Sequence, residues 1–209
     1  ECYFPGRALK RIAARITRTQ DTGLMRYEVP PGLPSLCESL ALRMVGYGCE
    51  VSAADILITN GCHEALGIAL KCVAEPGDVV LLESPTYYGL LQAVDTLGLR
   101  AIEIPCHPGS GIDLDKVRDA CERWNVKACI VVSNFSNPLG SCPDNQQKQA
   151  LLTLLSSYKV PLVEDDIYGD LAFDGHRPSP YKRYDTTGEV LYCSSFSKSV
   201  SPGLRVGWL

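Results

Sequence analysis

From residue 55 onward, short runs of branched apolar residues alternate with longer segments in which apolar residues recur at the helical period. The runs predict strands at 56–59, 79–83, 100–106, 127–134, 161–166 and 189–193. The segments between them predict helices at 63–73, 88–96, 114–124 and 146–158. This alternation predicts an α/β fold, a three-layer sandwich in which helices cover both faces of a mainly parallel sheet.

The two ends of the chain depart from this alternation. Residues 8–18 and a stretch ending near Gly46 have helical patterns, and a segment rich in proline and glycine, 27–36, lies between them. We therefore expect residues 1–54 to form an N-terminal arm and a lead-in helix, and residues 55–209 to form one large domain. The final run, LRVGWL, is apolar and strand-like with no turn after it. We expect an unpaired strand there, at a point where a longer chain is cut.

Composition and charge narrow the class of protein. The chain has 209 residues, of which 45% are hydrophobic and 21% charged, so it can bury a full core. Its net charge is −4 and it has no long basic run, so we expect no nucleic-acid binding through this segment. Its ten cysteines form no C-x-x-C pair and lie mostly in apolar stretches, which is typical of reduced cysteines in a cytoplasmic protein. The sequence predicts neither a signal peptide nor a membrane span.

A lysine, Lys198, lies among small hydroxyl residues in SSFSKSVSPGLR, just beyond the strand predicted at 189–193. Open α/β sheets bind their ligands at this edge. A lysine there is either an ordinary exposed residue or an amine that attacks a carbonyl group, which requires partial desolvation. The hydroxyls of Ser195 and Ser197 and the guanidinium of Arg205 favour the second interpretation, because together they could hold a phosphate beside the lysine.

Two turns carry further candidates. Gly61 in TNGCHEAL precedes a predicted helix, and the free N–H groups of a helix N-terminus bind anions, although many such turns carry a glycine for structural reasons alone. Asn137 in SNPLG precedes a proline, which favours an extended backbone. Its amide could be aimed into a cleft, and a simple turn is the alternative.

The strand predicted at 161–166 ends in two adjacent acids, Asp165 and Asp166. These could be metal ligands, a solvated turn or a partner for a protonated ring nitrogen. The three histidines of the chain, His63, His107 and His176, are not in metal-ligand spacing with these acids, so we expect no transition-metal site.

Taken in order, these motifs resemble those of the fold-type-I pyridoxal-phosphate enzymes, specifically the class I/II aminotransferase family. PGDVVLLESPTYYG is similar to the family's strand and turn ending in an aromatic residue, SNPLG to its N-P-x-G turn, EDDIY to its D-x-x-Y motif and SFSK…PGLRVG to its cofactor-lysine signature. The resemblance covers nearly the whole chain. It implies the large cofactor-binding domain of that fold, with pyridoxal 5'-phosphate as cofactor.

The resemblance also implies a role for each candidate. Lys198 would bind the cofactor covalently, and Asp165 would pair with the pyridinium nitrogen so that the ring can accept carbanion charge. Tyr168 and Asn137 would hydrogen-bond the phenolic oxygen of the ring, and Tyr87 would stack on its face. The residues implied in phosphate binding are Gly61, Cys62, His63, Ser195, Ser197 and Arg205, with Tyr27 contributed by the partner subunit of a homodimer.

Some details differ from the commonest aminotransferase pattern. Leu139 replaces the usual threonine of N-P-T-G, and SNFSNPLG, EDDIYGDL and CSSFSK are most similar to the aminotransferase-like half of MocR-type (GntR family) transcription regulators. In that group a DNA-binding winged helix-turn-helix domain precedes the cofactor domain, and in the wider family a small C-terminal domain follows it. We expect neither within this sequence.

Two functions follow from the resemblance. One is an effector sensor that binds an amino acid or amine and biases an attached DNA-binding domain, and the other is an active amino-acid aminotransferase. A structural relic without cofactor is a third alternative.

Overall fold

The computed structural model describes residues 4–19 and 27–209. Within them, one eight-stranded sheet has the order β1-β8-β7-β6-β5-β2-β3-β4. Its strands are β1 (Ile58–Thr59), β2 (Val79–Ser84), β3 (Arg100–His107), β4 (Gly111–Ile112), β5 (Val126–Val132), β6 (Leu162–Asp165), β7 (Val190–Ser195) and β8 (Gly207–Trp208). β3, β2, β5, β6 and β7 are parallel, whereas β8 is antiparallel to β1 and β7, and β4 to β3. The prediction of a mainly parallel sheet is confirmed.

The α-helices of the described chain are α1 (Gly6–Thr19), α2 (Pro34–Gly46), α3 (Cys62–Val73), α4 (Tyr88–Thr96), α5 (Leu114–Arg123) and α6 (Asn145–Ser157). The short 3₁₀ turns are η2 (Ala53–Asp55), η3 (Gly169–Leu171), η4 (Tyr181–Tyr184) and η5 (Pro202–Leu204). Asp113 caps α5 by accepting a hydrogen bond from Asp115 N (3.0 Å), and Asp144 caps α6 by accepting from Gln147 N (2.8 Å). These caps help to explain why the predicted helices at 114–124 and 146–158 agree with the structure to within one residue.

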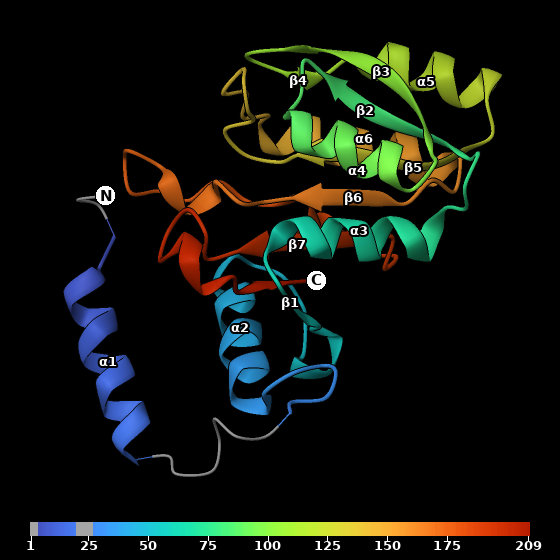
Figure 1. Cartoon of the computed structure of the whole chain (residues 1–209). Helices are drawn as coiled ribbons and strands as arrows, with labels where there is room; N and C mark the ends of the chain where they lie inside the picture. The colour runs from blue at the N-terminus through green and yellow to red at the C-terminus, as the bar shows by residue number, and fades with distance from the viewer. Residues whose placement is uncertain (1–3, 20–26) are drawn as a thin grey trace.

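Helices cover both faces of the sheet (Figure 1). α3 and α4 pack on one face, against alternate residues of the central strands such as Val80. α5 and α6 pack on the other face, against the intervening residues such as Leu81. Because both faces of β2 are buried, its sequence is a continuous apolar run rather than an alternating one. The predicted three-layer α/β sandwich is therefore confirmed.

The carboxyl end of the chain corrects one expectation. LRVGWL does not form an unpaired strand, because β8 lies between β1 and β7 and the backbone of Leu209 exchanges hydrogen bonds of 2.8 and 2.9 Å with Leu57. The strand predicted at 56–59 is shortened to β1, since Ile56 closes the 3₁₀ turn η2. β4 overlaps the end of the turn HPGSG, whose glycines and proline obscured a strand of only two residues.

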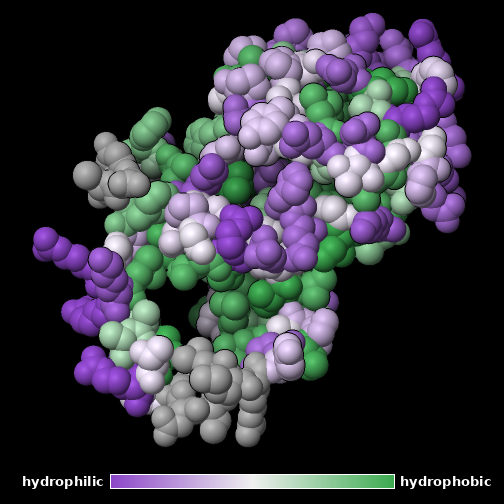
Figure 2. Space-filling model, viewed as in Figure 1, coloured by the Kyte–Doolittle hydropathy of each residue, from purple (hydrophilic) through white to green (hydrophobic). Residues whose placement is uncertain are grey.

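The two N-terminal helices differ in their packing. α1 buries none of its residues and stands at the left of Figure 1, and Figure 2 shows its most hydrophilic side chains on the outer side. α2 packs on the sheet, because its Leu40 and Met44 share a core cluster with Tyr192 and Trp208. The boundary predicted between residues 54 and 55 remains a prediction. None of the described helices combines the length and apolar character that crossing a bilayer requires.

Candidate functional site

A pocket of about 440 Å³ lies at the carboxyl ends of β5, β6 and β7, near the amino ends of α3 and α4. Parallel strands bring their carboxyl ends to one edge, so residues far apart in the sequence meet there. Ten of the twelve predicted site residues line it: Cys62, His63, Tyr87, Asn137, Asp165, Tyr168, Ser195, Ser197, Lys198 and Arg205. The other two are Gly61, which lies against Arg205, and Tyr27, which is fully exposed and outside the pocket.

One end of the pocket is suited to an anion. Gly61, with φ of 88°, precedes the first turn of α3, whose N–H groups have no partner within the helix. Arg205, in the left-handed conformation with φ of 52°, donates to Asn60 O (3.2 Å) and Ser197 Oγ (3.4 Å). The backbone N–H of Ser197 donates to Ser195 Oγ (3.2 Å). A helix N-terminus, a guanidinium and two hydroxyls therefore converge, as the predicted phosphate site requires.

Gly207 of β8 supports this end of the pocket. A Cβ atom at Gly207 would lie 2.4 Å from the carbonyl carbon of Gly61 and 2.8 Å from the nitrogen of Cys62, and neither backbone atom can move aside independently. We expect Gly207→Ala to lower the free energy of unfolding by about 1–3 kcal/mol and to weaken phosphate binding. Gly67→Ala is the matched control, because α3 leaves open space at Gly67 and alanine favours a helix. Thermal unfolding of both variants tests this, and equal midpoints would contradict it.

The other end of the pocket carries a buried carboxylate. Asp165 closes β6, is 6% exposed and accepts a hydrogen bond from Cys62 Sγ (3.3 Å). Burial raises the pKa of Asp165 to about 6; the charge of Asp166 acts in the same direction, and Cys62 and Lys198 oppose it. No cation of the described residues forms a salt bridge with Asp165. The carboxylate is therefore available to a cationic group of a ligand.

Asp166 is engaged elsewhere. Its side chain is fully buried and accepts hydrogen bonds from Asn134 Nδ2 (2.9 Å), from Tyr192 OH (2.9 Å) and from the guanidinium of Arg177. These donors occupy both carboxylate oxygens, and Asp166 does not line the pocket. The geometry therefore supports Asp165, rather than Asp166, as the partner for a protonated ring nitrogen.

The raised pKa of Asp165 affects stability. In the folded, cofactor-free protein it is about 6, against about 3.9 for an ordinary aspartate. The stability that the neutral carboxyl contributes is thus fully present below the ordinary pKa and is lost as the pH rises through about 6. Asp165→Asn stays neutral throughout.

As the pH rises from about 4 to about 7, the free energy of unfolding should therefore fall further in the parent protein than in Asp165→Asn. The difference between the two falls should reach up to about 3 kcal/mol. Burial raises the pKa of Glu83 and of Glu164 to about 7. Both residues are present in each protein, and the charge of Asp165 is the smallest of the causes that act on Glu83, so their contributions largely cancel in the comparison. Denaturant unfolding of cofactor-free protein at several pH values measures the difference. Parallel curves would show that Asp165 does not carry this effect.

Aromatic residues and an amide surround the middle of the pocket. The ring of Tyr87 lies over Gly89, where a Cβ atom would come within 2.3 Å of Tyr87 Cε1. The absence of a side chain at Gly89 thus lets Tyr87 fold back against the chain. Burial raises the pKa of Tyr168, and a hydrogen bond with Asn137 acts in the opposite direction. Tyr168 and Asn137, which the sequence predicted to share one ring oxygen, both line the pocket.

Lys198 lines the pocket but is exposed to solvent. No carboxylate of the described residues lies within salt-bridge distance of its amine. The sequence led us to expect a partly desolvated Lys198 amine. The described residues of this chain instead leave the Lys198 side chain exposed to solvent. The amine is nevertheless accessible to a ligand in the pocket.

These features fit pyridoxal 5'-phosphate. The anion-binding end suits a phosphate, the buried and unpaired carboxylate of Asp165 suits a protonated ring nitrogen, and the accessible amine of Lys198 suits an aldehyde. When bound, such a ring supplies an electron sink for charge that develops on the α-carbon of an amino acid. The residue roles themselves remain predictions.

Sequence reasoning missed several residues near this pocket. Tyr88 and Gln92 of α4 line it, and helical periodicity alone does not indicate which end of a helix faces a ligand. Glu83 lies buried at the end of β2 and accepts a hydrogen bond from Val132 N (2.7 Å). A signal for Glu83 was present, because a single acid closes the apolar run VVLLE.

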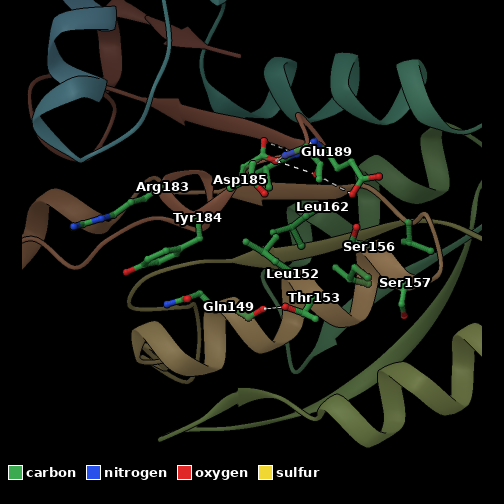
Figure 3. Close-up of a pocket in the computed structure, with 15 residues that line it drawn as sticks. Gln149, Leu152, Thr153, Ser156, Ser157, Leu162, Arg183, Tyr184, Asp185 and Glu189 are labelled. Carbon is green, nitrogen blue, oxygen red and sulfur yellow. Dashed lines mark hydrogen bonds between the residues drawn. The ribbon is translucent and has the colours of Figure 1, made fainter.

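A larger hollow of about 630 Å³ lies between α6 and residues 183–190 (Figure 3). It contains none of the predicted site residues. Its buried carboxylate, Asp185, already accepts hydrogen bonds from Lys182 Nζ (2.8 Å) and from the backbone N–H groups of Gly188 (2.8 Å) and Val190 (3.1 Å). Asp185 therefore stabilises its own turn, and the smaller pocket is the better candidate for chemistry.

Curated relatives include both regulators and enzymes. The HTH-type transcriptional regulator YjiR of Escherichia coli (strain K12) is 41% identical over 96% of this chain and 43% of its own length. Aromatic-amino-acid aminotransferase 1 of Thermococcus litoralis is 31% identical over 99% of this chain and 51% of its own length. The chain thus spans about half the length of the curated relatives it matches.

Solved structures share the fold. Kynurenine aminotransferase of Pyrococcus horikoshii, in complex with PMP, matches with a TM-score of 0.89 and 29% identity over 99% of this chain and 52% of that chain. The α-aminoadipate aminotransferase LysN of Thermus thermophilus, complexed with N-(5'-phosphopyridoxyl)-L-leucine, matches with a TM-score of 0.90 and 30% identity over the same shares. The family profile "Aminotransferase class I and II" matches residues 3–209. The chain therefore belongs to the class I and II aminotransferase family.

Proposed function

We propose that this chain is a pyridoxal-phosphate-binding domain that senses an amino acid or amine within a MocR-type transcription regulator. The observation that carries the proposal is its similarity to two HTH-type regulators of Escherichia coli (strain K12), YjiR and YdcR. They are 41% and 40% identical to it over 96% and 99% of the chain, whereas the Thermococcus litoralis aminotransferase is 31% identical.

The pocket supplies what such a sensor needs. Arg205 and the first turn of α3 anchor the phosphate, Asp165 keeps the ring nitrogen protonated, and the Lys198 amine attaches the cofactor. An amine effector would bond to the aldehyde-derived carbon of the cofactor in place of the Lys198 nitrogen, and the Lys198 amine would then be free in the pocket. The effector would raise the population of the protein conformation that binds it more tightly.

The proposal includes a homodimer in the cytoplasm. Tyr27 is fully exposed and outside its own pocket, which agrees with a contact to the phosphate of a partner subunit. The nine cysteines that the structure describes are free, which agrees with a reducing compartment.

An active aminotransferase is the second candidate. The similarity to the Thermococcus litoralis enzyme favours it, and so does the accessible amine of Lys198, which could serve as a base at the α-carbon of a substrate.

Experiments on the full-length protein separate the two functions. With cofactor added, amino acids and amines are supplied one at a time while affinity for DNA and release of 2-oxo acid are followed. The sensor proposal expects at least one compound to change DNA affinity by about fivefold or more without sustained turnover. Sustained transamination with unchanged DNA affinity, or a coding sequence with no helix-turn-helix domain before residue 1, would favour the enzyme.

A further inference from the structure

The segment that follows β6 carries one of the predicted cofactor contacts, Tyr168, and begins directly after another, Asp165, the last residue of β6. Its backbone is held near its ends, where Asp166 N donates to Cys193 O (2.9 Å) and Leu171 N donates to Tyr168 O (2.9 Å). Between β6 and the 3₁₀ turn η3 no regular element shapes it. Side-chain contacts must therefore help to fix where Tyr168 points and how the chain leaves β6 after Asp165.

One guanidinium, that of Arg177, spans this segment. Its Nη2 pairs with Asp166, and its Nε donates to Asp170 Oδ1 (2.9 Å), so it joins residues on both sides of Tyr168. Its Nη1 donates to Pro178 O (3.1 Å), and the side chain is only 16% exposed. A planar guanidinium can bind two carboxylates in a fixed geometry, which a lysine ammonium cannot reproduce.

Gly169 makes room for this bridge. A Cβ atom at Gly169 would lie 2.6 Å from Asp166 Oδ1 and 2.7 Å from Arg177 Nη2. The backbone of Gly169 is outside the left-handed region, so the position needs a glycine for space and not for conformation. An alanine there would disturb the contact between Asp166 and Arg177 while keeping every charge.

The same cluster reaches α2. The guanidinium carbon of Arg177 lies 3.5 Å from the ring centroid of Tyr47. Asp170 also accepts hydrogen bonds from Tyr47 OH (2.9 Å) and Arg43 Nη2 (2.5 Å). The segment after β6 is therefore tied to the lead-in helix as well as to Arg177.

We infer that Arg177 is a positioning residue that clamps residues 166–170 and so fixes Asp165 and Tyr168 in the pocket. It acts through Asp166 and Asp170, because Arg177 does not line the pocket. Without Arg177, Asp166 would be a buried carboxylate that lacks its cation, and the two ends of the segment would no longer be joined. The inference rests on the proposed cofactor site.

Three variants of the full-length protein test the clamp: Arg177→Met, Arg177→Lys and Gly169→Ala. The matched control is Arg118→Met, which removes an exposed arginine that pairs with Asp115 on α5. Amide hydrogen exchange of residues 166–171 is followed in cofactor-free protein, and the dissociation constant for pyridoxal 5'-phosphate is measured separately. If Arg177→Met does not fold, Gly169→Ala still tests the inference, because it disturbs the contact between Asp166 and Arg177 without removing a charge.

We expect Gly169→Ala and the folded Arg177 variants to speed exchange of these amides by about tenfold or more and to weaken cofactor binding by a similar factor. Arg177→Lys should not rescue either property, because one ammonium cannot replace the planar bridge. Unchanged exchange in Gly169→Ala, or full rescue by lysine, would overturn the inference. A parent protein that fails to bind the cofactor would refute the proposed function instead, since the exchange measurement does not depend on the cofactor.

Discussion

Asp165→Ala is expected to weaken binding of pyridoxal 5'-phosphate by about a hundredfold or more, because a buried ion pair that loses one partner costs about 3–5 kcal/mol. In the bound state the ring nitrogen would lose the carboxylate that pairs with it and keeps it protonated. The fold itself should survive this change. Burial raises the pKa of Asp165, so the folded, cofactor-free protein gains nothing from the ionised side chain. An absorbance titration with cofactor, paired with thermal unfolding, measures both effects.

Asp166→Ala is the contrasting variant, with the opposite pattern of effects. Arg177, Asn134 and Tyr192 would all lose their shared acceptor inside the protein, so the free energy of unfolding should fall by about 3–5 kcal/mol. Cofactor affinity of the protein that remains folded should change less than in Asp165→Ala. Equal losses of affinity, or a larger loss in Asp166→Ala, would show that the wrong acid has been assigned to the ring nitrogen.

Lys198→Ala is the second variant with a large expected effect. It should abolish covalent attachment of the cofactor while leaving the phosphate end of the pocket intact, because Ser197 and Arg205 form that end without the Lys198 amine. The visible absorption band of bound cofactor should be lost, and some non-covalent affinity should remain. Lys116→Ala, at an exposed position on α5, is the control. A variant at Lys198 that still shows the parent's band would mean that another amine binds the cofactor.

The layered fold could be predicted from the sequence because each element had its own local signal. β2 is a continuous apolar run, which a strand buried on both faces requires, and Asp113 and Asp144 mark where α5 and α6 begin. The position of β8 could not be predicted. Its place between β1 and β7 depends on hydrogen bonds with residues such as Leu57, far earlier in the chain, and no local pattern reports such a pairing.

The candidate site likewise contains some residues that could be predicted from the sequence and others that could not. Residues at or just beyond strand ends, such as Asp165 and Gly61, were predictable because strand ends gather at one edge of a parallel sheet. Arg177 was not, since it lies in the turn FDGHRP and approaches Asp166 and Asp170 only through the fold. The engagement of Asp166 by Asn134 and Tyr192 likewise appears only when β5, β6 and β7 are side by side.

Identification of the amine that binds the cofactor tests the assignment of this pocket most directly. The full-length protein is incubated with pyridoxal 5'-phosphate, reduced with borohydride and digested, and the modified peptide is located by mass spectrometry. We expect one phosphopyridoxyl group per chain, on Lys198, together with a visible absorption band that disappears on reduction. Labelling at another lysine, such as Lys182, or no stoichiometric labelling at saturating cofactor, would contradict the assignment of this pocket.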